Sequence, residues 1–208
     1  MEVRVDGGPA IGRLSGQMSS SAPALAPRQH LSERQAATVG GLLDAAVEEL
    51  RSVGYDGLTV RNVARRAGVA PATAYNYFAS REHLVTEVFW RRLESHPETH
   101  LDGRWSAPRR VGVTLSELAL LVADEPELAA ACTVAMLSGD PDVRVLRDRI
   151  GLEWRRRVQE ALGGDGDDDQ LTAIEFAVSG AMLRAGMGHL DYTDLPGVLS
   201  RTAELVLR

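Results

Sequence analysis

Polar and aromatic side chains that suit hydrogen bonding to a nucleic acid gather in one short segment, PATAYNYFASR at residues 71–81. Ala74 and Phe78 lie four residues apart in it, so on a helix they share one apolar face. The hydroxyl and amide groups then point mostly elsewhere; they belong to Thr73, Tyr75, Asn76 and Tyr77. A short helix with such an outer face fits the major groove of DNA and can bond to phosphates and base edges.

The flanking residues predict two helices and a turn that would position this segment. Thr59 is a good N-cap for a first short helix, whose apolar face comprises Val60, Val63, Ala64 and Ala67. Gly68 tolerates the positive φ that ends a helix, and Pro71 suits the first position of the next one. Ser80 caps a third helix. These signals predict a helix-turn-helix. The alternative is a helical hairpin inside an ordinary helical bundle. Two exposed tyrosines on one short helix are unusual in such a bundle.

The stretch GLTVRNVARRAGVAPATAYNYFASREHLV resembles the DNA-binding signature of the TetR family of bacterial transcription regulators. The matching features are LT before the first short helix, A-x-x-A-G-V at the turn, T-x-Y-x-Y-F in the recognition helix, and the basic Arg81. The resemblance covers residues 35–93, and beyond them it is one of pattern only. Two positions depart from the family. Ala70 replaces a usual capping Ser or Thr, and Ala74 replaces a larger aliphatic residue.

The resemblance implies an all-α fold, with an N-terminal three-helix DNA-binding domain and a C-terminal helical bundle for ligand binding and dimerisation. It also implies a set of DNA-binding residues: Thr59, Arg61, Pro71, Ala72, Thr73, Tyr75, Asn76, Tyr77 and Arg81. Arg61 matches a position from which the family reaches a base, and arginine pairs bidentately with guanine. A phosphate clamp or a solvated side chain is the alternative for Arg61. Pro71 and Ala72 offer apolar contact, whereas the hydroxyl groups suit phosphate oxygens.

Composition and the positions of Pro and Gly residues divide the chain into three parts. These are an arm over residues 1–29, a DNA-binding domain over 30–95, and an effector-binding and dimerisation domain over 96–208. The arm is rich in Gly, Ser, Ala and Pro, and Met18 is an alternative start. A capping box at Ser32–Gln35 starts the first helix, and Gly54 stops it. Five apolar-periodic segments follow in the C-terminal domain, at about 108–123, 126–137, 141–162, 168–190 and 194–207.

The segment at 168–190 carries small residues at three- and four-residue spacing, which allows close helix approach. They are Ala177, Gly180, Ala181, Ala185 and Gly188. A dimer is expected because two recognition helices must reach half-sites about one DNA turn apart. We expect this face to pack against the second copy; a tight contact within one chain is the alternative.

Apolar side chains of the C-terminal domain are candidates for the wall of a ligand cavity, because such sites are mostly apolar. The candidates are Trp105, Cys132, Met136, Trp154, Phe176, Met182 and Met187, and a place in the ordinary core is the alternative for each. Residues 93–208 contain twelve Arg against twenty Asp or Glu, which favours a neutral or cationic ligand. Residues 28–92 contain nine Arg against seven acidic residues, so the DNA-binding half is weakly electropositive.

The composition excludes several classes of function. The 208 residues have a net charge of −6 and are 44% hydrophobic, as in ordinary globular proteins, and the apolar runs are too short to span a bilayer. No lysine occurs, so a P-loop lysine and a Schiff-base lysine are excluded. Cys132 is the only cysteine, so no disulfide forms within one chain and a reducing cytoplasm is expected.

Metal and catalytic patterns are weak. His96 and His100 are four residues apart, but Pro97 breaks the helix between them, which favours a solvated loop over a metal site. GGDGDDD at 163–169 lacks the ligand order of a calcium loop. No G-x-S-x-G nucleophile elbow occurs, and we expect neither an enzyme nor a cofactor.

The sequence therefore predicts a ligand-responsive transcriptional repressor. It would bind a palindromic double-stranded DNA operator as a homodimer and respond to a small hydrophobic effector. The alternative from another class is an all-α small-molecule-binding protein or enzyme with an incidental helix-turn-helix. Binding to DNA upstream of its gene separates the two.

Overall fold

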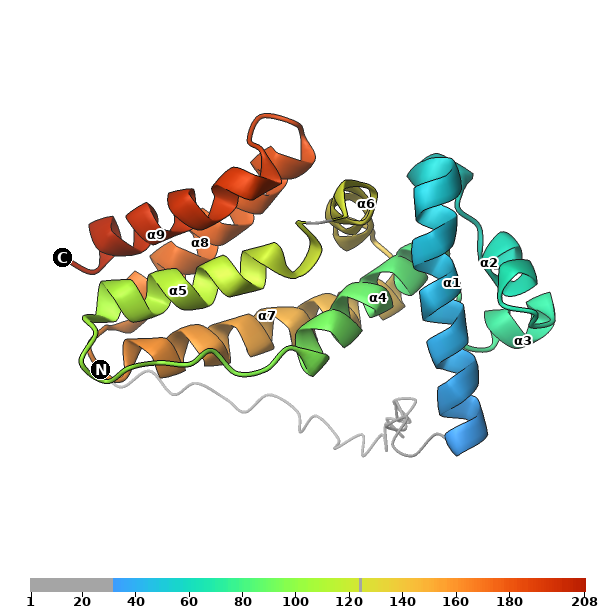
Figure 1. The fold of residues 1–208 in the computed structure, drawn as a ribbon, viewed down its shortest axis with the longest axis horizontal. Helices are drawn as coiled ribbons and strands as arrows, with labels where there is room; N and C mark the ends of the chain where they lie inside the picture. The colour runs from blue at the N-terminus through green and yellow to red at the C-terminus, as the bar shows by residue number, and fades with distance from the viewer. Residues whose placement is uncertain (1–31, 124) are drawn as a thin grey trace, which may run out of the picture.

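A computed structural model describes residues 32–123 and 125–208, and within these ranges the chain folds into helices with no strand. One end of the molecule is built from α1 (Glu33–Gly57), α2 (Val60–Arg66) and α3 (Pro71–Tyr75) (Figure 1). The other end is built from α5 (Ala107–Ala119), α8 (Asp168–Gly186) and α9 (Leu195–Val206), and α4 (Arg81–Ser95) and α7 (Pro141–Leu162) run between the two ends. The predicted all-α class is confirmed; the predicted arm over residues 1–29 lies outside the described residues.

The first helix begins and breaks at the residues that the sequence indicates. Ser32 Oγ accepts a hydrogen bond from the Gln35 backbone N–H, and Gln35 Oε1 accepts one from the Ser32 backbone N–H. This pair of bonds is the predicted capping box. Gly54 has φ 68° and ψ −179°, so the helical path kinks there before one further turn to Gly57. Leu42, Ala46 and Leu50 form the buried stripe of α1.

The helix-turn-helix has the predicted local chemistry. Thr59 caps α2 through a bond from Asn62 N–H, and Ser80 caps α4 through a bond from His83 N–H. Gly68 ends α2 with φ 67°, in the left-handed region that glycine favours. Ala70 precedes α3 without a side-chain cap, so this five-residue helix depends on Pro71 and on packing of Ala74.

The C-terminal helices agree with the predicted segments, with two differences in their bounds. A turn of 3₁₀ helix, η1 (Leu120–Val122), ends the segment predicted at 108–123, and α6 (Pro126–Met136) follows it. The segment predicted to reach residue 190 stops at Gly186, because Gly188 adopts φ 74°. A second 3₁₀ turn, η2 (Tyr192–Asp194), leads into α9. Within residues 32–123 and 125–208, each helix is either too short or too polar to span a lipid bilayer.

Two apolar clusters hold the ends of the molecule. The first joins α1–α4 to α6 and to Ile150 of α7, and the second joins α5, α7, α8 and α9. Close approach of α5 and α9 depends on Gly112, since a Cβ there would lie 3.2 Å from the Ser200 Cα. Trp154 packs against both clusters and so lies where they meet.

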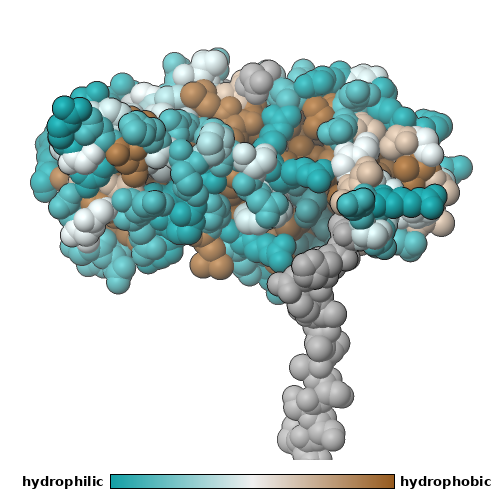
Figure 2. Space-filling model, turned by 60° about the horizontal axis from the view of Figure 1, so that its bottom comes forward, coloured by the Kyte–Doolittle hydropathy of each residue, from teal (hydrophilic) through white to brown (hydrophobic). Residues whose placement is uncertain are grey.

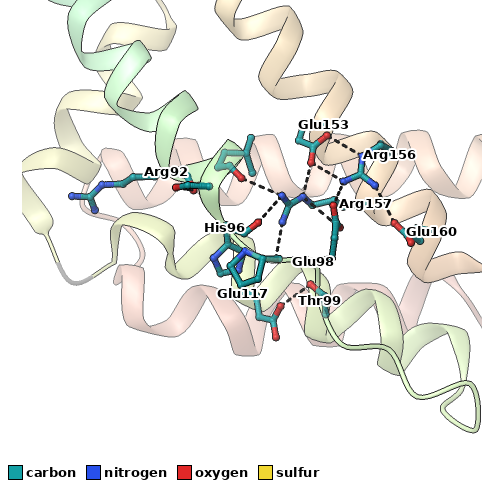
Figure 3. A network of polar contacts seen from close by, with 12 residues as sticks. Arg92, His96, Glu98, Thr99, Glu117, Glu153, Arg156, Arg157 and Glu160 are labelled. Atoms are coloured by element: carbon teal, nitrogen blue, oxygen red, sulfur yellow. Dashed lines mark hydrogen bonds and ion pairs between the residues drawn. The ribbon is translucent and has the colours of Figure 1, made fainter. Parts of the chain in front are cut away.

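Arginine side chains close the carboxyl ends of four helices, where unpaired carbonyl groups and the helix dipole favour a cation. Arg81 donates to the last turn of α1, Arg147 to that of α6, and Arg110 to that of α7. Arg157 is only 4% exposed and donates to the backbone oxygens of Leu93 and His96 at the end of α4 (Figure 3). The arginines of this lysine-free chain therefore join helices to one another.

Candidate nucleic-acid interface and ligand cavity

The third helix presents polar groups outward, as its sequence predicts. Ala74 is fully buried and Phe78 is 2% exposed, so this apolar face docks on the core. Pro71, Ala72 and Asn76 are exposed on the other side, together with Tyr75, of which 51% is exposed. Thr73 and Tyr77 are half-buried, and Tyr77 packs against the core. The outer face of α3 can thus approach another molecule without any rearrangement of its backbone.

The start of α2 adds a cation beside this face. Arg61 is exposed and forms no hydrogen bond or ion pair with any residue that the structure describes. Arg65 donates to the Asn62 side chain, and Arg66 pairs with the buried Glu49 at 2.7 Å. Thr59 uses its hydroxyl oxygen as the α2 cap while remaining exposed. Arg61 is therefore the cation of α2 with the most freedom to reach a phosphate or a base.

Arg81 has a structural role that the sequence did not reveal. Its Nε donates to Glu82 at 3.0 Å, its Nη1 donates to the Tyr55 and Asp56 carbonyl oxygens, and its guanidinium lies 4.4 Å from the Tyr55 ring centroid. Burial, followed by the hydrogen bond to Glu82, raises the pKa of Tyr55 to about 12, so its hydroxyl stays a donor. A phosphate contact by Arg81 would require it to leave these partners.

A cavity of about 750 Å³ lies in the C-terminal half, between α6, α7 and α8. Four of the predicted wall residues line it: Cys132, Met136, Trp154 and Met182. The sequence did not single out the other apolar wall residues, which include Phe89, Leu115, Ile150, Val158, Ile174 and Val178. This size and lining suit a small apolar molecule.

The other predicted wall residues lie elsewhere. Phe176 is 75% exposed and does not line the cavity, because Ile174 and Val178 occupy the inward face of α8 and a residue midway between them points outward. Trp105 does not line the cavity either; it precedes α5, and the Arg109 guanidinium stacks 4.5 Å from its ring. Met187, which ends α8, is 60% exposed.

Arg155 and Glu175 of the cavity wall pair with each other, and Cys132 in the same wall is held neutral. Arg155 donates to both carboxylate oxygens of Glu175 at 2.9 Å, which pairs the two charges within the wall. Burial raises the pKa of the Cys132 thiol to about 12, so the cavity contains a neutral thiol at physiological pH. The neutral state disfavours the thiolate chemistry of a redox sensor.

The small residues of α8 do not share one face in the way that dimer packing requires. Ala181 and Ala185 are buried in the core of their own chain, which matches the alternative of a tight intrachain contact. Ala177 is half-buried, whereas Gly180 and Gly188 are exposed. The exposed side of α8 instead carries an apolar strip, which we call the α8 strip: Phe176, Gly180, Leu183 and Met187. Leu183 of this strip also lines the cavity. Figure 2 shows one face of the molecule, on which apolar patches interrupt a largely hydrophilic surface.

The metal patterns of the sequence remain unsupported. The described residues contain no cluster of three His, Cys, Asp or Glu side chains that could hold a metal ion. The His96 backbone oxygen accepts from Arg157 at the end of α4. Residues 163–167 connect α7 to α8, and residues 168 and 169 lie in the first turn of α8. Asp167 in that connection caps α8 through a capping box with Gln170.

Comparison with known proteins places this chain among bacterial regulators. The sequence profile described as "Bacterial regulatory proteins, tetR family" matches residues 42–88. An uncharacterized HTH-type transcriptional regulator of Mycobacterium tuberculosis is 46% identical over 176 residues, which cover 84% of this chain and 82% of the relative. The HTH-type transcriptional repressor KstR of Rhodococcus jostii is 27% identical over 176 residues, covering 80% and 81% of the two chains.

Solved structures share the fold. A TetR transcriptional regulator from Rhodococcus sp. RHA1 superposes with a TM-score of 0.67 at 24% identity, covering 85% of this chain and 98% of that one. The regulator FadR from Bacillus subtilis, solved in complex with stearoyl-CoA, superposes with a TM-score of 0.58 at 19% identity, covering 81% and 97%. Both likenesses extend over the helix-turn-helix and the C-terminal helices together.

Proposed function

The chain belongs to the TetR family of bacterial transcriptional regulators, and on that basis we propose that it is a repressor whose hold on DNA is released by an apolar effector. The cavity carries the second half of this proposal. A space of about 750 Å³ with a mostly aliphatic and aromatic wall has a ligand-sized volume, which well-packed cores do not leave open. The proposal places the protein in the cytoplasm, where its DNA lies, and assigns it neither an enzymatic activity nor a cofactor.

The DNA-binding surface in this proposal is the outer face of α3 with the start of α2. Exposed Tyr75 and Asn76 supply hydrogen-bonding groups, and the hydroxyls of Thr59, Thr73 and Tyr77 border them. Pro71 and Ala72 at the start of α3 provide apolar contact for a thymine methyl. Arg61, which has no partner among the described residues, supplies the charge that reads a base or clamps a phosphate. We assign residues 30–95 to this domain and residues 96–208 to effector binding and dimerisation.

A homodimer is the second element of the proposal, and we assign its interface to the α8 strip. Phe176 is the most exposed large apolar side chain of α8 and stands beside exposed Gly180, which has open space above it. Gly180 has no side chain, so the α8 strip of a second copy can approach closely at this position. The Phe176 side chains of both copies would then be buried in the interface. Two copies would place two recognition helices on a palindromic operator.

The effector in this proposal has a long or bulky apolar body. Its wall contacts would be Cys132, Met136, Trp154 and Met182 from the predicted set, joined by Ile174 and Val178. FadR, which shares the fold, was solved with stearoyl-CoA, a ligand with such an apolar chain. The competing reading, an all-α binding protein or enzyme with an incidental helix-turn-helix, accounts for the cavity but not for the exposed polar face of α3.

A DNA-release screen tests this function. Fluorescence anisotropy first measures binding to labelled duplexes from the region upstream of its own gene, at several salt concentrations. Fatty acids, fatty alcohols and sterols are then added, and DNA release is compared with the change in Trp154 emission. We expect sequence-specific binding and release by at least one apolar compound that also shifts the emission. Binding without sequence preference would contradict a regulator, and release without any effect on Trp154 would contradict this cavity as the effector site.

A further inference from the structure

The first turns of α4 and α7 are capped by side chains that bond to each other. Ser80 Oγ accepts from the His83 N–H at 3.0 Å as the N-cap of α4. Asp140 Oδ1 accepts from the Asp142 N–H at 2.8 Å as the N-cap of α7. Ser80 Oγ also donates to Asp140 Oδ2 at 2.6 Å, so this bond is one of the polar contacts between the DNA-binding and C-terminal domains, which also include the Arg51–Glu125 ion pair. That bond lowers the pKa of Asp140, which keeps the carboxylate charged and the bond strong at neutral pH.

Asp140 ends a short turn that begins at the cavity wall. Met136 and Leu137, at the end of α6, both line the cavity, and so does Arg147 of α7. Arg147 Nη1 donates to the Met136 carbonyl oxygen at 2.5 Å and to the Ser138 carbonyl oxygen at 3.3 Å. Ser138 Oγ in turn accepts from the Asp140 N–H at 3.2 Å. A continuous series of hydrogen bonds therefore runs from the cavity wall to the cap of α7 and on to Ser80.

The two ends of α4 are held with very different strength. At its carboxyl end, Arg157 of α7 donates to the carbonyl oxygens of Leu93, His96 and Pro97, with its own side chain 4% exposed (Figure 3). At its amino end, the part-buried Ser80–Asp140 bond and the approach of His83 to Asp142 at 3.6 Å connect it to α7. Because three bonds to one guanidinium, one of them buried, cost more to break than one part-buried bond, the Ser80–Asp140 bond is the one that breaks more easily.

We propose that the Ser80–Asp140 hydrogen bond, which we call the cap latch, carries occupancy of the cavity to the DNA-binding helices. This inference rests on the proposed effector function. A ligand that displaces Met136 or Arg147 shifts the 137–140 turn and draws Asp140 away from Ser80. Four residues separate Ser80 from the end of α3, so its release frees the recognition helix to change its angle. The ligand shifts the equilibrium only as far as it prefers the released state.

A cavity-filling substitution makes the test possible without a known effector. Cys132 is buried in the cavity wall, so Cys132→Phe places a bulky group there. Cys132→Ser, which adds no bulk, is the matched control, and a cooperative thermal transition confirms that each variant is folded. The measurement is the ratio of the DNA dissociation constants of the Cys132→Phe and Cys132→Ser proteins, on a duplex selected from a random library by the wild type.

A swap of the two caps isolates the latch from helix capping. Ser80→Asp keeps a good N-cap for α4 but places two carboxylates against each other, and Asp140→Ser keeps a cap for α7 but removes the acceptor. The double variant, Ser80→Asp with Asp140→Ser, retains both caps and restores one hydrogen bond in the reverse direction. It also keeps the added charge of the first variant near the DNA, so it is the matched control for that charge.

With Ser80 and Asp140 both in place, we expect Cys132→Phe to weaken DNA binding by about tenfold relative to Cys132→Ser, a usual size for coupling between two sites. In each single variant the ratio should fall below about twofold, and in the swap it should return toward the wild-type value. Single variants that keep the wild-type ratio would overturn the latch while leaving the effector function intact. A folded Cys132→Phe protein that binds DNA as tightly as Cys132→Ser would overturn the proposed effector function itself, and the latch with it.

Discussion

Gly186 of α8 lies so close to Thr133 of α6 that a Cβ added to the glycine would stand 2.4 Å from the Thr133 Cγ2 atom. Thr133 cannot turn away freely, because its Oγ1 bonds to the Ala129 carbonyl oxygen and to the Tyr192 hydroxyl. Both α6 and α8 line the cavity, so this contact sets the spacing of two of its walls.

Replacing Gly186 by alanine is therefore expected to destabilise the protein. The added methyl group forces α8 away from α6, and we expect a loss of about 1–3 kcal/mol in the free energy of unfolding, as for overpacked cores. Gly41→Ala in α1 is the matched control, since nothing lies within 4 Å of a Cβ there and alanine favours a helix by about 0.5–1 kcal/mol. Urea unfolding measures both. Equal stability of the two variants would show that α8 can shift without cost.

Acid stability should depend on Glu153. Hydrogen bonds from Arg156 and then Arg157 lower the pKa of Glu153 from an ordinary 4.5 to about 2 (Figure 3). Because the folded pKa lies below the unfolded one, this contribution is complete above about pH 4.5 and is lost as the pH falls toward 2. Glu153→Gln should cost about 2 kcal/mol at pH 7, the range for hydrogen bonds to charged groups, and much less near pH 2.

Glu160→Gln serves as the control for that pH series. Glu160 also pairs with Arg156, at 3.1 Å, but its side chain is 58% exposed, so its removal should cost less than about 0.5 kcal/mol. Urea unfolding at several pH values compares the two. If Glu153→Gln costs the same at every pH, the carboxylate does not supply the acid-sensitive stability.

Arg81→Ala should lower the free energy of unfolding, because the Arg81 side chain holds α4 against the end of α1. The variant loses the bonds to the Tyr55 and Asp56 carbonyl oxygens and the stacking on the Tyr55 ring, and we expect a loss of about 1–3 kcal/mol. Arg61→Ala, at an exposed side chain, should change the free energy of unfolding by less than about 0.5 kcal/mol. Thermal unfolding without DNA distinguishes them. A stable Arg81→Ala with a salt dependence of DNA binding reduced by about one ion would instead restore Arg81 as a phosphate contact.

Phe176→Glu should separate the proposed dimer. The charge falls in the middle of the α8 strip, where a partner would bury it without a counter-ion. Leu120→Glu is the control, because Leu120 is also apolar and 47% exposed but belongs to η1. Sedimentation equilibrium should show monomers for the first variant and dimers for the second. A dimeric Phe176→Glu would move the interface away from α8.

Local signals in the sequence predicted the helices well. The bounds of α7 agree with the predicted 141–162, because Pro141 starts the helix and Gly163, with φ 62°, ends it. Thr59, Ser80 and the Ser32–Gln35 capping box act as the sequence indicates. Each of these signals acts within one turn of chain, so a single sequence is enough to interpret it.

Contacts between helices were harder to predict. Phe176 was assigned to a cavity by residue type, although the spacing of Ile174, Val178, Ala181 and Ala185 already marked the opposite face as buried. Arg81, Arg147 and Arg157 find carbonyl partners on other helices, and no hydropathy pattern indicates which helix end an arginine will meet. The cap latch could not be predicted from the sequence for the same reason, since its two residues are 60 positions apart.

The most direct test of the account is selection of DNA by the purified protein from a random duplex library, followed by binding of Arg61→Ala to single-base variants of the selected site. We predict a palindrome with half-sites about one DNA turn apart, bound more weakly as salt rises. If Arg61 reads a base, its loss should relax preference at one position of each half-site, by about 1–3 kcal/mol. A loss spread evenly over all positions would leave Arg61 as a phosphate clamp. Recovery of no preferred sequence at all would contradict the central claim that this chain is a sequence-specific regulator.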